Sequence, residues 1–76
     1  MNEKRRKLLK KAVNELEKAS SIVDAVSEEE QNCLDNIPDN LQESEMSYRM
    51  ENAIDCLQDA IEDIENAIEK VKEAGI

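Results

Sequence analysis

A strict heptad repeat runs through the second half of this 76-residue chain and constrains its fold more than any other feature. Aliphatic side chains recur there in alternating steps of three and four residues, which places them along one stripe of an α-helix. An alanine precedes every second member of the stripe, so a neighbouring helix can approach closely. The predicted seam consists of Met50, Ile54, Leu57, Ile61, Ile64, Ile68 and Val71, with Ala53, Ala60 and Ala67 beside it.

The first half of the chain carries a looser form of the same spacing. It predicts a second helix whose seam faces the first, with a polar interruption at Glu30 where the packing should loosen. Leu8, Val13 and Ile22 lie beside this seam and broaden it. The predicted seam positions are Leu9, Leu16, Val23 and Val26, with Ala12, Ala19 and Cys33 in the same stripe.

Residues 35–43 separate the two helices and contain the only proline of the chain, Pro38. Proline cannot continue a helix interior, and the neighbouring Asn and Asp residues favour turns. Ser44 is the predicted N-cap of the following helix. A short helical turn is expected over residues 38–42, with Ile37 and Leu41 filling the closed end of the molecule.

These patterns predict one all-α domain over residues 1–76, with helices at about 3–34 and 44–74. Helices of matched length joined by a short turn pack antiparallel, so the expected fold is a coiled-coil-like two-helix hairpin. One seam buries little apolar surface for a chain of this size. We therefore expect a homodimer in which two hairpins form a four-helix bundle.

Charge is unevenly distributed along the chain. Residues 1–11 carry six cationic side chains and one carboxylate, a formal charge of +5. The whole chain has a net charge of −9, so the remaining residues carry −14. An acidic body disfavours binding to nucleic acid and to anionic membranes. The basic segment is expected to pair with the acidic end of the second helix, and the alternative is an exposed nucleic-acid or lipid patch.

The two cysteines, Cys33 and Cys56, fit neither a metal-binding spacing nor a disulfide framework. Cys33 is expected to pack in the seam, and Cys56 to be exposed and too far away for a disulfide. The chain has no apolar run typical of a signal peptide or a membrane span. A reduced, cytoplasmic setting is the prediction.

The sequence lacks the parts that most catalytic and metal sites need. It has no His, no Gly-rich phosphate loop and no nucleophile with an evident partner. The segment from Asp35 fails as a calcium-binding loop, because Ile37 and Asn40 occupy positions that need an oxygen ligand and a glycine. We expect no catalytic activity, no cofactor, no metal and no small-molecule substrate.

Two small groups of residues are candidate contacts with a partner protein. Tyr48 and Arg49 combine the only aromatic side chain with a neighbouring Arg, a combination enriched at interfaces. The simpler interpretation is a half-buried Tyr that covers the turn. Glu28 and Glu29 belong to an acidic run that is either a contact site or a solvated helix face.

The stretch over residues 35–71 resembles a group of small uncharacterised helical proteins of Firmicutes prophages and mobile elements. The resemblance rests on Asn36, Pro38, Asn40, Leu41, Gln42, Ser44 and Glu45, followed by Ala53, Ile54, Asp55 and Leu57. It covers about half of the chain. It implies a helical hairpin and a mobile-element setting, and it implies no activity and no site residues.

The sequence thus favours a small acidic module for protein–protein interaction that pairs with itself and with an unidentified protein. One alternative is an anti-defence inhibitor whose acidic surface mimics DNA. A second alternative is a nucleic-acid-binding hairpin dimer that uses the basic N-terminal segment.

Overall fold

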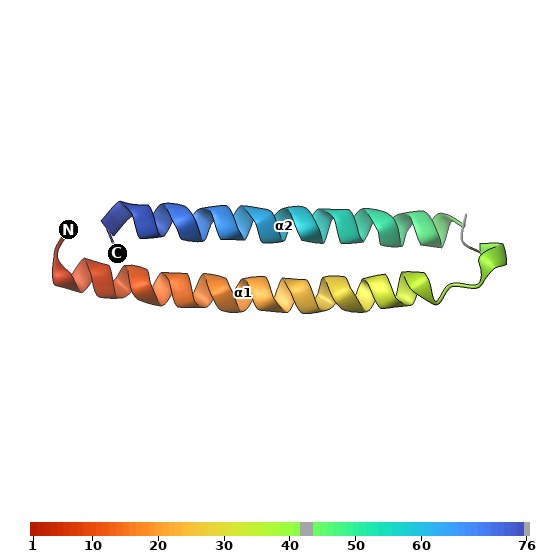
Figure 1. Ribbon diagram of the computed structural model, residues 1–76, viewed down its shortest axis with the longest axis horizontal. Coiled ribbons are helices and arrows are strands. Elements are labelled where there is room, and N and C mark those ends of the chain that lie inside the picture. The colour runs from red at the N-terminus through yellow and green to blue at the C-terminus, as the bar shows by residue number, and fades with distance from the viewer. Residues whose placement is uncertain (42–43, 76) are drawn as a thin grey trace.

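The computed structural model describes residues 1–41 and 44–75 and shows two long antiparallel helices (Figure 1). Helix α1 spans Glu3–Asp35, the short 3-10 helix η1 spans Asp39–Leu41, and α2 spans Glu45–Gly75. The Cα atoms occupy 60 × 14 × 11 Å. The predicted all-α hairpin is confirmed, and the predicted helix bounds differ from these by one residue at most.

Local hydrogen bonds fix the ends of α1. At its start, Asn2 is the N-cap, and its Oδ1 accepts a hydrogen bond of 2.9 Å from the Arg5 N–H. At its end, the Asn36 side chain donates to the Asn32 carbonyl at 2.8 Å, and the Ile37 N–H donates to the Leu34 carbonyl at 3.2 Å. The next residue is Pro38, which has no N–H to donate, so the helix stops here.

The turn also follows sequence chemistry. The Leu41 N–H donates to the Pro38 carbonyl at 2.8 Å, which closes η1. The predicted cap of α2 is confirmed, because the Ser47 N–H donates to Ser44 Oγ at 3.2 Å. The helical turn predicted over 38–42 corresponds in part to η1, and its last residue, Gln42, lies outside the described residues, as does Glu43.

Only one of the two side chains expected at the closed end is buried. Ile37 is 7% exposed, whereas Leu41 is 44% exposed. The prediction for Leu41 is wrong, because η1 leaves it among the exposed residues. At the other end of the rod, a Cβ added to Gly75 would lie 3.4 Å from Met1 Cε, so the two ends of the chain lie side by side.

The seam of α2 lies where the heptad repeat places it. Ile54 is buried, and the other six predicted positions are half-buried against α1. The repeat continues one step further at each end than the aliphatic residues indicate. Ser47, 1% exposed, extends it toward the turn, and the half-buried Gly75 extends it toward the open end.

The seam of α1 differs from the prediction in one of its two columns of residues. Leu9, Leu16 and Val23 face α2 as expected, and each is half-buried. The second column runs through the buried Val13 and Ser27, not through Val26, which is 48% exposed. The observed seam runs through Leu9, Val13, Leu16, Ser20, Val23, Ser27, Glu30 and Leu34, and Ala12 and Ala19 of the predicted column are half-buried beside it.

Both columns satisfy the heptad spacing, so spacing alone could not choose between them. Hydropathy favoured the wrong one, because the observed column contains two serines. Its larger members, Val13 and Leu34, lie toward the two ends of the seam, and the small Ser20 and Ser27 lie between them. Cys33 belongs to the rejected column and is exposed, so its predicted packing in the seam is wrong.

Candidate interaction surfaces

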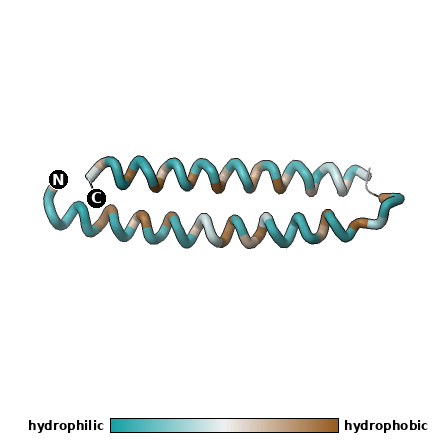
Figure 2. The backbone as a smooth tube through the Cα atoms, viewed as in Figure 1, coloured by the Kyte–Doolittle hydropathy of each residue, from teal (hydrophilic) through white to brown (hydrophobic). Residues whose placement is uncertain are grey.

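The rejected column leaves α1 with a second apolar stripe beside the seam, in which Ala12 and Ala19 are half-buried and the larger side chains are exposed. This stripe also follows the heptad spacing, and its largest members, Leu8 and Ile22, are 58% and 65% exposed. Hydrophobic residues accordingly recur along α1 beyond those that pack against α2 (Figure 2). The stripe consists of Leu8, Ala12, Ala19, Ile22, Val26 and Cys33.

A column of small side chains flanks the seam of α2. Ala53, Ala60 and Ala67 are half-buried, and the same column ends at Met46, which is 55% exposed. In a parallel pair of helices, residues that flank the seam at equivalent heptad positions lie on opposite sides of the pair. In an antiparallel pair, these equivalent residues lie on the same side. In this antiparallel hairpin the two stripes therefore lie on the same side.

Together these stripes form one continuous surface, which we call the apolar face. It consists of Leu8, Ala12, Ala19, Ile22, Val26 and Cys33 of α1 with Met46, Ala53, Ala60, Ala67 and Ala74 of α2. A shallow depression lined by Met1, Arg5, Leu8 and Leu9 extends it to the open end. The sequence had placed Leu8, Val13, Ile22 and the three inner alanines beside the predicted seams, and of these Val13 lies in the observed seam. It missed Met46, although Met46 lies seven residues before Ala53.

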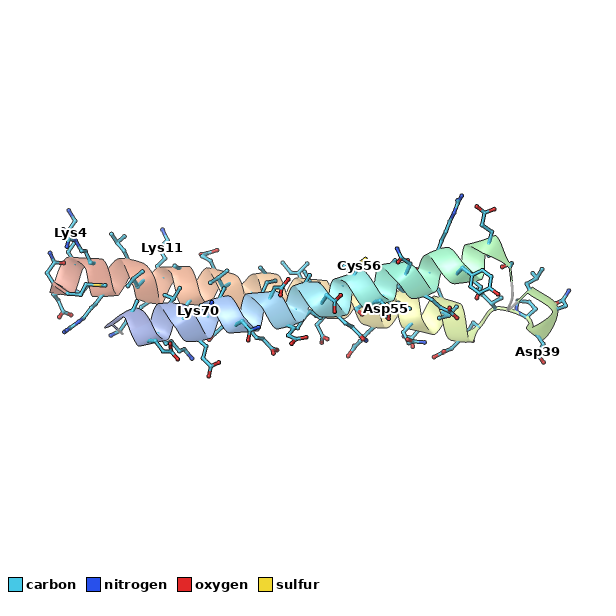
Figure 3. The ribbon with its side chains drawn as sticks, turned by 90° about the horizontal axis from the view of Figure 1, so that it is seen from above. Lys4, Lys11, Asp39, Asp55, Cys56 and Lys70 are labelled. Carbon is cyan, nitrogen blue, oxygen red and sulfur yellow. The ribbon has the colours of Figure 1, made fainter. Side chains whose placement is uncertain are left out.

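Charged side chains within the apolar face and along its borders balance one another, because Arg5, Glu15 and Glu29 occupy the same heptad columns of α1 as its apolar members. Three cations and three carboxylates stand there, so this side of the rod has no net charge. They are Arg5, Arg49 and Lys70 with Glu15, Glu29 and Asp63. Figure 3 shows the border residue Cys56 at the upper edge of the hairpin, where Lys4 and Lys11 also project.

The opposite side of the hairpin, which we call the acidic face, carries most of the negative charge. Ten carboxylates and three lysines give it a net charge of −7. Most carboxylate oxygens in Figure 3 accordingly lie along the lower edge. The carboxylates are Glu3, Glu17, Asp24, Glu28, Asp35, Glu51, Asp55, Glu62, Glu65 and Glu69, and the lysines are Lys7, Lys10 and Lys72.

The structure separates the four predicted contact residues into two pairs near the closed end. Tyr48 and Glu28 lie on the side of the acidic face, whereas Arg49 and Glu29 border the apolar face. Tyr48 is 57% exposed, so it does not cover the turn as a half-buried residue would. Arg49 Nη2 pairs with Glu45 Oε1 at 2.7 Å, an exposed ion pair that contributes little to stability.

The basic N-terminal segment does not form the ion pairs expected with α2. Between described residues, the Arg49–Glu45 pair is the one ion pair within 4.0 Å. Lys4 and Lys11 occupy the outermost heptad position of α1, where their ammonium groups extend into solvent, as Figure 3 shows. Direct ion pairing of the basic segment with α2 is therefore not observed between described residues, and the muting of its charge by neighbouring carboxylates stays a prediction.

Both cysteines are exposed and unpaired with each other. The prediction that Cys56 is exposed is confirmed. Cys33 belongs to the apolar face near its closed end, and Cys56 lies at its border close to the middle of α2. Among residues 1–41 and 44–75, no three His, Cys, Asp or Glu side chains gather closely enough to hold a metal ion.

Comparisons with protein-family models, with curated protein sequences and with solved structures find no match for this chain. In the described part of the chain, neither helix combines the length and the hydropathy needed to cross a membrane. The two faces of the hairpin are therefore the features from which we infer a function.

Proposed function

We propose that this protein is a small acidic interaction module that pairs with a second copy to form a four-helix bundle and binds another protein. The observation that carries the proposal is the division of its surface. One side of the rod is apolar and has no net charge, while the other is acidic and polar. A molecule with two such sides can use one for self-association and keep the other for a partner.

Self-association is supported by how little the hairpin buries alone. Among described residues, only Val13, Ile37 and Ile54 are buried hydrophobic side chains, and two of the most buried residues are serines. Each fully buried aliphatic side chain contributes roughly 1.5–3 kcal/mol, while ordering costs about 1–2 kcal/mol per residue. Leu8, Ile22 and Met46 are available to enlarge this core once their face is covered.

Binding of a partner protein is supported by the acidic face. Its carboxylates project from both helices along the rod and would attract a surface rich in Lys and Arg over distances of about a Debye length, roughly 8–10 Å at physiological salt. Tyr48 stands exposed at the closed end of this side and offers a large amphipathic contact surface. A basic, elongated protein surface is the partner that this chemistry fits.

The test compares binding of host proteins to two charge-neutralised variants. The first carries Glu62→Gln, Glu65→Gln and Glu69→Gln on the acidic face. The matched control carries Glu15→Gln, Glu29→Gln and Asp63→Asn, which removes the same charge from the other side. We expect salt-sensitive capture of a partner by the wild type and the control but not by the first variant. Equal capture by both variants, or no capture at all, would contradict the proposal.

Mimicry of DNA is a second candidate, favoured by the −14 charge of residues 12–76 and its concentration along one side of the rod. A DNA-binding enzyme would then bind the acidic face in place of phosphates. Inhibition of such an enzyme that survives neutralisation of Glu28–Glu30 and Asp59–Glu65 would exclude this candidate. The mobile-element setting stays a prediction of the resemblance, and the neighbouring genes would test it.

A further inference from the structure

We infer that a second copy of this chain covers the apolar face with the two-fold axis parallel to the rod, so that α1 of each copy packs against α2 of the other. The inference rests on the self-association proposed above and adds its surface and its geometry. Both parts follow from residues that the hairpin places along one side.

The area of the apolar face suits a stable dimer. The Cα atoms alone span 60 Å along the rod and 14 Å across the two helices. Covering one such side would bury roughly 800 Å² per copy, which is about the contribution of each partner to a standard-size interface. A helical segment from an unrelated protein would cover only a strip of this width, whereas a second hairpin matches both its length and its width.

Two symmetric arrangements are available to two hairpins that meet at this face. In the first, the two-fold axis is parallel to the rod, and α1 lies against α2 of the second copy. In the second, the axis crosses the rod, and each helix lies against its own equivalent. Every neighbouring pair of helices is antiparallel in both arrangements, so helix direction does not choose between them.

The side chains that would meet in the first arrangement are complementary. Rotation about an axis parallel to the rod keeps each residue at its own level, and the antiparallel pairing of the two seams brings equivalent heptad positions of α1 and α2 to nearly equal levels. At each level of the face, residues with equivalent heptad positions then oppose one another. The alanines and Val26 meet in the pairs Ala12–Ala67, Ala19–Ala60 and Val26–Ala53, and Ile22 meets Cys56.

Charges along the borders also agree with the first arrangement. One pair of opposite charge forms between border positions of the two copies, Glu29–Arg49, and two form between outermost positions, Lys4–Glu73 and Lys18–Asp59, against one border pair of like charge, Glu15–Asp63. Lys11 and Lys18 flank that last pair and offset its repulsion. Border charges contribute little affinity individually, but they select orientation between otherwise similar dockings.

The second arrangement brings like charges together. The crossing axis would pass near the middle of each helix, where Lys18 would meet Lys18 and Asp59 would meet Asp59 of the second copy. Arg49 would meet Lys70 near each end. On α1, Glu15 would oppose Ile22, so a carboxylate would lie on an aliphatic side chain. Repulsion and desolvation both disfavour this docking.

The natural cysteines distinguish the two arrangements by distance. Cys33 lies 14 residues from Ala19, the middle of α1. At 1.5 Å per residue, a crossing axis would separate the two Cys33 Cα atoms by about 42 Å. An axis parallel to the rod keeps both at one level, about 14 Å apart across a bundle with interaxial distances near 10 Å. Cys56 lies close to the middle of α2 and is near its equivalent in both arrangements.

The experiment measures distances between spin labels in the full chain by electron paramagnetic resonance. One sample carries the label on Cys33 in a Cys56→Ser background, and the other carries it on Cys56 in a Cys33→Ser background. We expect a short distance between copies in both samples. A short distance from Cys56 with one near 40 Å from Cys33 would overturn the inferred axis and leave self-association intact.

A matched pair of variants tests the face itself. Ile22→Glu places a carboxylate in the apolar face, and Ala25→Glu adds the same charge three residues away on the outer side of α1. We expect the first to weaken dimerisation at least about 100-fold and the second to change it less than about threefold, measured by sedimentation. Equal effects would show that a different surface is the interface. A monomeric wild type, with no dipolar coupling in either labelled sample, would overturn both this inference and the proposed self-association.

Discussion

The corrected seam of α1 can be tested with one substitution made at two positions. Val13 is 6% exposed and faces α2, whereas Val26 is 48% exposed on the apolar face. Truncating either to Ala removes two methyl groups, worth about 1.6 kcal/mol when fully buried at about 0.8 kcal/mol each. Ala is the better helix former by roughly 0.5 kcal/mol, which offsets part of this loss.

Val13→Ala is therefore expected to lower the free energy of unfolding by about 1–2 kcal/mol, the upper part reflecting the cavity left behind. Val26→Ala should change it by less than about 0.5 kcal/mol, because its side chain has only about half as much burial to lose. The measurement is urea unfolding followed by helical circular dichroism. Both variants carry Ile22→Glu so that self-association does not contribute, and trimethylamine N-oxide is added to both if the native baseline is short.

The comparison is decisive because both substitutions act on the same helix with the same change in composition. A larger loss for Val26→Ala than for Val13→Ala would restore the column of Val26 and Cys33 as the seam and refute the description of α1 given above. Equal losses would mean that both columns are buried in the monomer, and the apolar face would then not be free for a second copy.

Three further outcomes are expected. Ser44→Ala should destabilise the protein by about 1 kcal/mol, because it removes the N-cap of α2. The control Ser21→Ala, on the exposed side of α1, should not destabilise it, and thermal unfolding of both variants would check this difference. Ile37→Ala should cost about 2 kcal/mol and Leu41→Ala less than about 0.5 kcal/mol, a difference that would vanish if Leu41 filled the closed end. At low salt and micromolar protein, a gel-shift assay with DNA and RNA should show no complex despite the exposed Lys4 and Lys11, and a shift abolished by Lys4→Glu with Lys11→Glu would instead favour the nucleic-acid-binding alternative.

The hairpin and the seam of α2 could be predicted from the sequence because several independent signals agree there. Isoleucine or leucine occupies most seam positions, alanine flanks them, and no competing stripe of similar hydropathy exists on that helix. Pro38 and the capping Ser44 then determine where the chain reverses. Under these conditions the heptad spacing is compatible with only one seam on α2.

The seam of helix α1 was harder to predict, because the helix contains three neighbouring columns of residues that all follow the heptad spacing. The column of Leu9, Leu16 and Val23 is common to every solution, but the column of Val13 and the column of Val26 flank it on opposite sides. The average hydropathy favours the column of Val26, which is not the column in the observed seam. The choice depends on how closely the backbones approach and on which side chains fill the ends of the seam, and neither property is visible in one helix considered alone.

The distribution of serine and valine in α1 leads to a last prediction. At residues 26 and 27, the larger aliphatic side chain lies on the outside of the hairpin, and Ser27, 5% exposed, lies in the seam. A double variant, Val26→Ser with Ser27→Val, exchanges the two without altering composition or charge. If packing in the seam alone determined stability, this exchange would raise the free energy of unfolding, because it buries two additional methyl groups, worth about 1–2 kcal/mol.

We expect the exchange to stabilise the monomeric hairpin and to weaken its dimer, because the same aliphatic group cannot serve both surfaces. In the Ile22→Glu background, the urea midpoint should rise; in the otherwise wild-type chain, the dimer dissociation constant should increase about tenfold or more, as sedimentation would show. A more stable monomer together with a weaker dimer would demonstrate that Ser27 lowers the stability of the hairpin, while Val26 strengthens its association with a second copy. A loss of stability in both assays would instead mean that the seam has no room for the larger aliphatic side chain, and that Ser27 is required by the close approach of the two backbones.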